Sequence, residues 1–471
     1  MDIKAIVDFI LGLGPSIMLP IIMTFIGLIL GQGISKSFRA ALTIGIGFVG
    51  IGLVIGLLFS ALAPATEAFV KSMGLKLDIM DVGWPIGAAI SFGTPVAPLM
   101  ILTGVVLNVI LLATNFTKTM DVDIWNYWHF IFAASVTYYA FHSMILALVV
   151  GCVIMAITLK QADWTAPVIE HHFGLPGVSL PHQETVNFAP IMYALNKIED
   201  RIPYFNKLNA NPESLQKNFG LFGEPMMMGL ILGALMAMLG KFDLKGILIT
   251  AVQMSASLVL LPRMVSLLME GLIPISEGAR DFLSKRFPGK KVYIGLDAAI
   301  VIGHPANMAV ALLMVPVAIL MAVILPYNRM LPFADLAVLP FTVIWAVAAS
   351  RGNIIRGIVN AIFALAIVFF LATSFADLAT TMGQAVGFKF PEGATLISGI
   401  DLGSHIVPWI ILHLLDFNNP GMMGLAGGCG VIYALMWYWV RNDIKKQYAN
   451  EIGEQYTDEL SKYSNNKTVK Q

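Results

Sequence analysis

Apolar runs of about the length of a membrane-spanning helix follow one another along almost the whole chain. Since about 20 apolar residues cross a bilayer as a helix, the pattern predicts about eleven transmembrane helices and one weaker candidate. Glycine and proline interrupt several runs, and the fourth is long enough to tilt or break. The predicted spans are Phe9–Gly31, Ala40–Leu62, Val96–Phe116, Trp128–Leu159, Leu221–Leu239, Gly246–Met269, Asn307–Leu325, Val338–Ala349, Arg356–Ala376, Asp401–Phe417 and Gly421–Val440, with Thr185–Ile198 as the weaker candidate.

The segments between the spans are too small or too apolar to form a soluble catalytic domain. Amphipathic stretches are expected at Pro64–Lys76 and Pro274–Lys285, and a long polar connector at Lys160–Gly220. The polar tail Arg441–Gln471 is expected to form a short helix. The N-terminal stretch has no small-residue cleavage site, so we interpret it as a retained first span rather than a signal peptide.

The two halves of the chain repeat one pattern at a constant offset of 210 residues. Ala88–Pro95 reads AAISFGTP, and Ala298–Pro305 reads AAIVIGHP. Each half then has the same order: two spans, an amphipathic stretch, a short segment broken by glycine and proline, and a long span. A match in register over some 80 residues predicts an internal repeat. Three further pairs keep the offset: Pro15 with Pro225, Pro64 with Pro274, and Glu67 with Glu277.

Loop charges indicate how the two halves are oriented, because lysine and arginine favour the cytoplasmic side. The charged residues between 67 and 81 sum to −1, whereas those between 277 and 291 sum to +3. This difference fits an N-terminus outside, five spans per repeat, one extra last span and a cytoplasmic C-terminus. Five is odd, so the second repeat is predicted to be inverted. The expected organisation is a first inverted repeat (1–200), a cytoplasmic connector (201–220), a second repeat (221–418), a last transmembrane helix (419–440) and a cytoplasmic tail (441–471).

Composition supports an all-α polytopic membrane protein. Hydrophobic residues make up 57% of the 471 residues and charged residues only 12%, and the mean hydropathy is +0.78. Soluble domains carry about 25% charged residues. A formal net charge of zero excludes a strongly basic or acidic partner such as nucleic acid. The only two cysteines, Cys152 and Cys429, lie in apolar runs, which excludes a disulfide framework.

Matched breaks in the two halves are typical of a transporter. In such proteins the substrate lies near the bilayer midplane, where the ends of half-helices present unpaired backbone groups. Gly93-Thr94-Pro95 and Gly303-His304-Pro305 are the matched breaks here. The alternative is that both are packing kinks in ordinary helices. No GxxxxGK[ST] loop or HExxH motif occurs, so ATP hydrolysis and zinc-protease chemistry are not indicated.

Polar residues within apolar spans are candidates for the substrate site, because burying them in a membrane is costly. His129 either faces the membrane interface beside its aromatic neighbours or lines a pocket. Asp297 directly precedes the repeated motif, where it could stabilise a helix dipole; we favour a role in accepting hydrogen bonds from a polyol. His182-Gln183-Glu184 either forms a polar surface loop or supplies donors and acceptors for several hydroxyls.

Other polar residues have weaker patterns. Asp401 and His405 lie in the counterpart of Thr185–Ile198 and are further candidates for lining the cavity. Glu224 is expected to cap a helix, and His142 to be a core histidine. Four charged residues are expected to pair with one another or to reach the membrane interface: Arg263, Glu270, Arg351 and Arg356.

One polar stretch resembles a known family. The residues Asn196-Lys197-Ile198-Glu199-Asp200-Arg201-Ile202-Pro203, the run from Asn206 to Glu213, and Phe222-Gly223-Glu224-Pro225 are similar to the galactitol-type enzyme IIC of the bacterial phosphoenolpyruvate-dependent phosphotransferase system. The similarity extends to about Val440. The linker NKIEDRIP…FGEP is its more specific part.

The resemblance implies a homodimer whose protomers each have a dimerising domain and a mobile core that moves like an elevator. A separate cytosolic IIB protein, itself supplied by IIA, phosphorylates the sugar from a phosphocysteine. The related ascorbate permease has a glutamine where this chain has Ala133, which implies a different ligand. The candidate substrate-binding set is Phe92, Gly93, Thr94, His129, His182, Gln183, Glu184, Asp297 and His304.

The function expected from the sequence is a permease subunit in the bacterial inner membrane that takes up a hexitol, with galactitol as the leading candidate. No catalytic residue, metal or cofactor is expected. Phosphorylation makes the product an anion, which cannot recross the bilayer. The alternatives are an ion-coupled secondary transporter and a membrane-embedded enzyme using His129, His182 and Asp297. The expected docking surface for IIB is the basic segment Arg280–Lys291 with the loop Lys36–Arg39.

Overall fold

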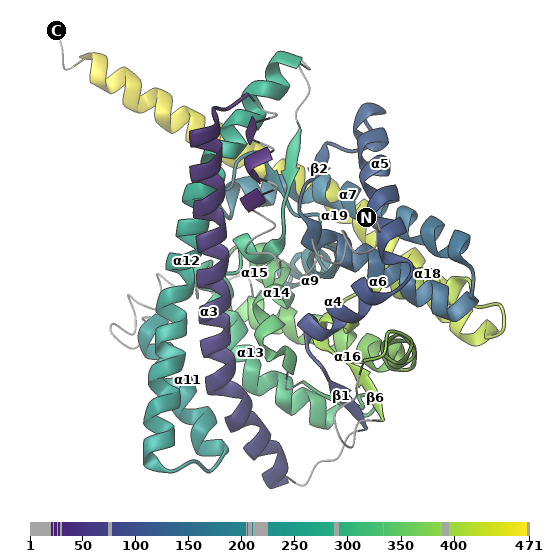
Figure 1. The fold of residues 1–471 in the computed structure, drawn as a ribbon. Helices are drawn as coiled ribbons and strands as arrows, with labels where there is room; N and C mark the ends of the chain where they lie inside the picture. Colours follow the sequence, from purple (N-terminus) through teal and green to yellow (C-terminus); the bar gives the residue numbers. More distant parts are fainter. Residues whose placement is uncertain are drawn as a thin grey trace.

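The chain folds almost entirely into helices, as the apolar pattern predicts (Figure 1). This computed structural model describes residues 20–21, 23–25, 27–28, 31–73, 78–203, 205, 210, 225–286, 292–332, 334–388 and 395–468. The expectation of an all-α chain is wrong in one respect: the described residues also form six strands, each of two or three residues. Strands this short leave no alternating pattern in the sequence.

Three helices form one side of the molecule, which we call the long-helix layer. α3 (Ile34–Met73) and α12 (Leu244–Arg286) run side by side, and α11 (Pro225–Leu239) packs against α12 (Figure 1). Gly271 of α12 permits the close approach, because a Cβ at this position would stand 2.6 Å from the backbone oxygen of Ala40 in α3. A side chain there would push the two helices apart.

The two amphipathic stretches continue the preceding spans, so the expectation of separate segments is wrong. Pro64–Lys76 belongs to α3 as far as Met73, and Pro274–Lys285 lies within α12. A proline inside a helix removes one backbone hydrogen bond and tends to bend the helix, but it does not always end it. The change from apolar to amphipathic sequence therefore does not mark a helix boundary here.

The predicted break at Gly93-Thr94-Pro95 is confirmed. α4 (Trp84–Gly93) ends there and α5 (Ala97–Ala113) begins, and the apolar helices on the two sides, 86–93 and 97–113, are bent by 89°. Thr94 has an extended backbone (φ −73°, ψ 154°), which ends α4. The residue before a proline avoids helical angles for steric reasons, so Pro95 explains why the chain turns at this point.

The long predicted span Trp128–Leu159 is two helices. α6 (Ile124–Phe141) ends at His142, whose φ is +52°, and α7 (Met144–His171) begins after Ser143. The Ser143 side chain accepts a hydrogen bond from the backbone N–H of Leu146, which is the usual N-cap interaction. His142 was expected to be a core histidine, but it is the left-handed residue that ends α6.

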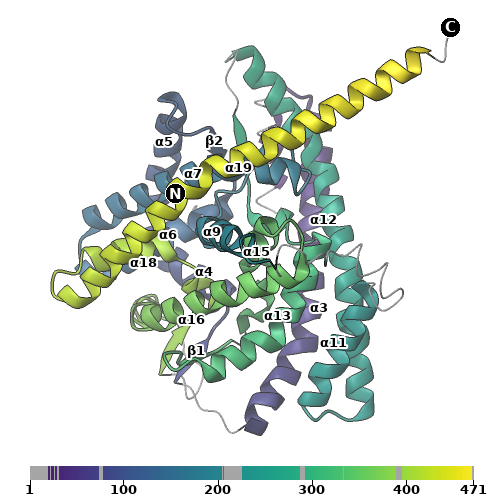
Figure 2. The same cartoon turned by 180° about the vertical axis from the view of Figure 1, so that it is seen from behind.

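The remaining helices include short ones that a hydropathy pattern does not separate. They are α8 (Gln183–Val186), α9 (Ala189–Glu199), η3 (Ala298–Ile300), α13 (Pro305–Ile324), η4 (Ala334–Val338), α14 (Leu339–Thr342), α15 (Ile344–Ala349), α16 (Ile354–Ala385), α17 (Ile400–Gly403), α18 (Ile406–Leu414) and α19 (Pro420–Thr468). α19 crosses the back of the molecule, and its C-terminal end projects beyond the other helices (Figure 2).

Two expectations about the polar segments are wrong. The connector Lys160–Gly220 is not one loop, because its first residues complete α7 and α8 and α9 follow. The tail is not a short helix but the continuation of α19 to Thr468.

Arg356 was expected to pair with Arg263, Glu270 or Arg351 or to reach the interface. Instead it pairs with two carboxylates at the end of α9, Glu199 at 2.9 Å and Asp200 at 2.7 Å. Glu224 lies outside the described residues.

Two small parallel sheets connect the halves of the chain. In the first, β1 (Ile79–Asp81) lies between β5 (Met330–Leu331) and β6 (Leu396–Ser398). In the second, β4 (Tyr293–Gly295) lies between β2 (Thr119–Asp121) and β3 (Val178–Ser179). Each sheet thus takes its central strand from one half of the chain and its two outer strands from the other.

The described residues contain four helices that are long and apolar enough to cross a membrane, or five if the bent pair 86–93 and 97–113 is one span. Many large apolar side chains on the helix surfaces are exposed, as expected for a chain surrounded by lipid. Together with the composition, these helices identify an integral membrane protein. The four helices are Met144–His171, Pro305–Ile324, Ile354–Ala385 and Pro420–Ile444.

Candidate functional site

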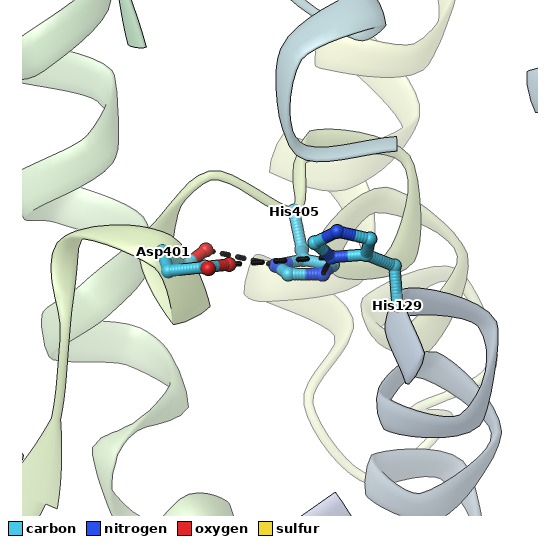
Figure 3. A group of neighbouring side chains, drawn as sticks. All are labelled: His129, Asp401 and His405. Atoms are coloured by element: carbon cyan, nitrogen blue, oxygen red, sulfur yellow. Dashed lines mark hydrogen bonds and ion pairs between the residues drawn. The ribbon is translucent and has the colours of Figure 1, made fainter. Parts of the chain in front are cut away.

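Three buried histidines from different parts of the chain lie ring to ring beside the small sheets. His129 comes from α6, His182 precedes α8 just after β3, and His405 precedes α18. The Nε2 atoms of His129 and His182 are 3.2 Å apart, and Nδ1 of His129 is 3.1 Å from Nε2 of His405. Figure 3 shows His129, from α6, and His405, from the turn before α18, pointing toward each other. We call these three residues the imidazole chain.

The protonation pattern of the neutral imidazole chain follows from its far end. Nδ1 of His405 lies 3.0 Å from the backbone oxygen of Asp401, and a carbonyl oxygen can only accept, so this nitrogen carries the proton. Nε2 of His405 then accepts from Nδ1–H of His129. By the same logic, Nε2 of His129 accepts from Nε2–H of His182. The nitrogen left with a free lone pair is Nδ1 of His182.

Buried carboxyl groups surround the imidazole chain. Oδ2 of Asp297 is 3.2 Å from Nε2 of His182, and Oδ1 of Asp401 is 4.0 Å from Nδ1 of His129 (Figure 3). The side chain of Glu184 is buried and hydrogen-bonded to that of Asp401. In the described part of the chain, the ion-pairing partners of Asp297 and Asp401 are imidazoles. Among the described residues, neither carboxyl group is therefore paired with a lysine or an arginine.

Several buried polar atoms of the site have no hydrogen-bond partner among the described residues. Buried polar groups are normally hydrogen-bonded, so a group of unpaired ones indicates space for a ligand with its own donors and acceptors. These atoms are His182 Nδ1, both amide atoms of Gln183, Glu184 Oε1 and Asp401 Oδ1.

Asp297 is held in place from the first half of the chain. Its backbone N–H donates to Oδ2 of Asp123 at 3.1 Å, and its own Oδ1 accepts from the N–H of Ala299 at 2.7 Å. Asp123 also caps α6, since its Oδ1 accepts from the N–H of Trp125. The local sequence explains the arrangement, because aspartate accepts readily from free N–H groups at a helix start.

Asp401 is positioned in a comparable way. Its backbone N–H donates to Oδ2 of Asp335 at 3.0 Å, while Oδ1 of Asp335 accepts from the N–H of Trp84 at 2.6 Å. The backbone N–H of Asp335 donates to Oδ2 of Asp81 at 2.8 Å. Two buried aspartates, Asp123 and Asp335, thus each link a strand end of one half to a helix start of the other.

The predicted site residues lie in three places: five around the imidazole chain, three on the broken helix, and His304 apart from both. His129, His182, Gln183, Glu184 and Asp297 belong to the imidazole chain and its carboxyl neighbours.

The broken helix lies against α6, with which the predicted site residues Phe92 and Thr94 make their contacts. Thr94 Oγ1 is 2.8 Å from Ser135 Oγ, and the ring of Phe92 meets the edge of Trp125. Gly93 packs against Val386. His304 lies elsewhere, with its ring 4.8 Å from that of His172.

Sequence reasoning did not identify Asp123 and Asp335, and it placed Asp401 and His405 only among secondary candidates. The available signal was the burial cost of a charged residue in an apolar segment. That signal does not tell a ligand from a residue that positions one.

Two overlapping donor sets are close enough to ligate one cation. His129, Asp401 and His405 form the first, and His129, His182 and Glu184 the second, with the donor atoms of each set within 4.8 Å of one another. The facing nitrogens of His129 and His405 are hydrogen-bonded to each other. A cation would therefore have to replace that hydrogen bond.

Comparison with known proteins finds one matching family and several related permease components. The family described as the PTS system sugar-specific permease component matches residues 9–393. The galactitol-specific EIIC component of the PTS system of Escherichia coli (strain K12) is 34% identical over 447 residues, which covers 94% of this chain and 98% of the relative. The galactitol-specific EIIC component of Escherichia coli O157:H7 gives the same values.

A further relative in Escherichia coli (strain K12) is a permease IIC component whose name specifies no sugar; it is 35% identical over 439 residues, covering 93% of this chain and 100% of the relative. These matches span nearly the whole length of each protein. The chain therefore belongs to the family of sugar-specific permease components, the enzymes IIC, of the bacterial phosphotransferase system.

Proposed function

We propose that this permease subunit carries a hexitol across the inner membrane, with galactitol as the leading candidate, and that a separate IIB protein phosphorylates the hexitol. The observation that carries the proposal is the group of buried, unpaired polar atoms around the imidazole chain. It combines acceptors (Glu184, Asp401, His182 Nδ1) with an amide that both donates and accepts (Gln183). A hexitol offers a hydroxyl on every carbon, each able to donate and accept.

The charge of the site supports a neutral ligand. A phosphate or carboxylate ligand is usually bound by arginine or lysine, and the polar groups described here are imidazoles, an amide and carboxyl groups. Galactitol is also the sugar named for two relatives of nearly the same length. The phosphoryl group comes from IIB, so the permease needs no nucleophile of its own.

We also propose that the chain is an inverted repeat with its N-terminus outside and its C-terminus in the cytoplasm. Matched hydrogen bonds in the two sheets support a repeat. Ile79 N–H donates to the backbone oxygen of Arg329 just before β5, and Tyr293 N–H donates to that of Lys118 just before β2. The central strand of each sheet is thus joined in the same way to an outer strand of the other half.

Matched turns extend the correspondence beyond the sheets. His142 and Arg351 both have a positive φ, 52° and 54°, and each lies one or two residues before the N-cap of the next long helix. Gly31 and Lys241, which are 210 residues apart, have φ values of 81° and 58°. These turns support residues 1–200 and 221–418 as the two repeats, joined by 201–220 and followed by 419–440 and 441–471.

The arrangement of the helices supports a division into a scaffold and a moving core. The residues of the imidazole chain and its carboxyl neighbours all come from outside the long-helix layer of α3, α11 and α12. We propose that this layer forms the homodimer contact and that the remaining helices move with the substrate. Elevator-like movement and a homodimer remain proposals for this chain.

The decisive experiment measures uptake of labelled galactitol by membrane vesicles holding this protein. Vesicles are assayed with and without IIB, IIA, the general phosphotransferase proteins and phosphoenolpyruvate. Galactitol phosphate inside, and only with the full set, supports the proposal. Free galactitol accumulating on a proton or sodium gradient supports the secondary transporter instead. A phosphorylated product from another polyol, with none from galactitol, retains the mechanism and changes the substrate.

A further inference from the structure

We propose that His182 accepts the proton of the sugar hydroxyl as that hydroxyl is phosphorylated, and that Asp297 positions His182 for this step. The inference rests on the proposed function, because it concerns the transfer of a phosphoryl group to a bound hexitol. It assigns to the permease subunit a catalytic residue, in addition to the residues that bind the sugar.

The reaction requires a proton acceptor. The hydroxyl oxygen forms a bond to phosphorus, the bond between phosphorus and the cysteine sulfur of IIB breaks, and its electron pair stays on the sulfur as a thiolate. The proton of the hydroxyl must leave during this exchange. A positioned base that takes such a proton typically accelerates a reaction by about 10²–10⁴-fold.

The imidazole chain leaves one nitrogen able to do this. Nδ1 of His405 donates to backbone oxygens, and both ring nitrogens of His129 are hydrogen-bonded to the neighbouring imidazoles. In the same neutral chain, Nε2 of His182 carries the proton shared with His129. Its Nδ1 is buried, has a lone pair and has no hydrogen-bond partner among the described residues. The order of the chain thus selects His182 from the three histidines.

Asp297 completes the arrangement. Its Oδ2 lies 3.2 Å from Nε2 of His182 and stabilises the imidazolium that forms when Nδ1 takes the proton. An imidazole base oriented by a buried carboxylate is the same logic that serves serine hydrolases. The other charged groups whose fields reach His182 are Glu184 and Asp123, and its ring also stacks on Phe341.

The competing acceptors are Glu184 and Asp401, each of which has an unpaired buried oxygen. Their carboxyl groups are hydrogen-bonded to each other, so at least one of them holds a proton in that contact. The experiment must therefore separate a histidine base from a carboxylate base.

The test is His182→Gln, because the amide nitrogen of glutamine can occupy the place of Nε2 and donate to Asp297, while the base at Nδ1 is removed. Purified protein in nanodiscs is mixed with an excess of phosphorylated IIB and labelled galactitol, and a single turnover is followed across a range of pH. Galactitol affinity is measured separately by calorimetry. His413→Gln is the matched control, since this half-buried histidine lies outside the site and contacts Ser374.

The expected result is a weaker galactitol affinity, because Nδ1 of His182 is also one of the proposed sugar acceptors, and a transfer rate at saturating galactitol that is lower by about 10²–10⁴-fold. The wild-type rate should fall toward low pH as Nδ1 becomes protonated, and this dependence should disappear in His182→Gln. At saturating galactitol, Asp297→Asn should slow the transfer less than His182→Gln does, and it should move the acidic limb of the pH profile to lower pH. It also serves as the test if His182→Gln does not fold.

Two results would overturn the inference. The first is wild-type transfer by His182→Gln, or, where that variant does not fold, by Asp297→Asn. The second is loss of the transfer rate and of its pH dependence in Glu184→Gln but not in His182→Gln. This result would assign the role of the base to the Glu184 carboxylate. If the wild-type protein neither binds nor phosphorylates galactitol, the proposed substrate fails first, and the experiment is repeated with the polyol identified by uptake.

Discussion

The hydrogen bond between His129 and His405 gives a test of the imidazole chain that does not depend on the substrate. In His405→Phe the ring volume is nearly kept, and so is the packing against Phe132, whose ring centre is 4.6 Å from that of His405. What is lost is the acceptor for Nδ1–H of His129 and the donor to the backbone oxygen of Asp401. Leaving a buried donor unsatisfied costs about 1–3 kcal/mol.

The loss of folding stability caused by His405→Phe should depend on whether His129 is present. In the double variant His129→Phe/His405→Phe no buried imidazole N–H is left unsatisfied at this contact, so the loss should be smaller than the sum of the two single losses. Contacting groups typically show a coupling of about 0.5–3 kcal/mol. Unfolding in mixed detergent micelles, followed by tryptophan fluorescence, measures all four corners of the cycle, with His413→Phe as the control. Additive losses would refute the proposed hydrogen bond.

Three further predictions concern other parts of the chain. Gly271→Ala should lower stability by about 1–3 kcal/mol, because the added methyl overpacks the contact between α3 and α12; Gly424→Ala, where a Cβ meets no neighbour within 4 Å, is the control for thermal unfolding. The hydrogen bond from Arg329 lowers the pKa of the Asp78 carboxyl from its ordinary value of 3.8. A lowered folded-state pKa means that the contribution is present above pH 3.8 and is lost as the pH falls below it. Arg329→Ala should therefore cost less than about 1 kcal/mol at neutral pH, because the pair is exposed, and nothing in strong acid; an equal cost at both pH values would contradict this. The last prediction concerns the expected IIB docking surface, at Arg286, Lys290 and Lys291, whose side chains lie outside the described part of the chain. Reversing these three charges should weaken phosphorylation by IIB more than galactitol binding. Equal phosphorylation rates in mutant and wild type would exclude this docking surface.

Local pattern was sufficient for the membrane class and for much of the helix layout. Apolar runs predicted α5 and α13 to within a few residues, because a helix in lipid must be apolar along its whole length. They also predicted where α16 begins, but α16 continues nine residues beyond the predicted end, to Ala385. Proline and glycine predicted the break at Gly93-Thr94-Pro95, since these residues restrict or free the backbone whatever surrounds them.

The sequence also singled out His129, His182 and Asp297, and the structure brings these three side chains together. The signal was the cost of placing a polar or charged group in an apolar segment. That cost applies to each residue by itself, so it can be judged without knowing the neighbours. It does not say which of the polar residues meet.

Only the tertiary structure decided the partners of these residues. His405 contacts His129 across 276 positions of sequence, and Asp335 holds Trp84 across 251. The two small sheets likewise pair strands from opposite halves, and they position Asp297 and Asp401. Periodicity records which face of a segment is buried, but a hydrogen bond between distant segments depends on how the whole chain packs. The sequence alone therefore determined the class of protein and its candidate residues, while the tertiary structure decided how those residues are assembled into a site.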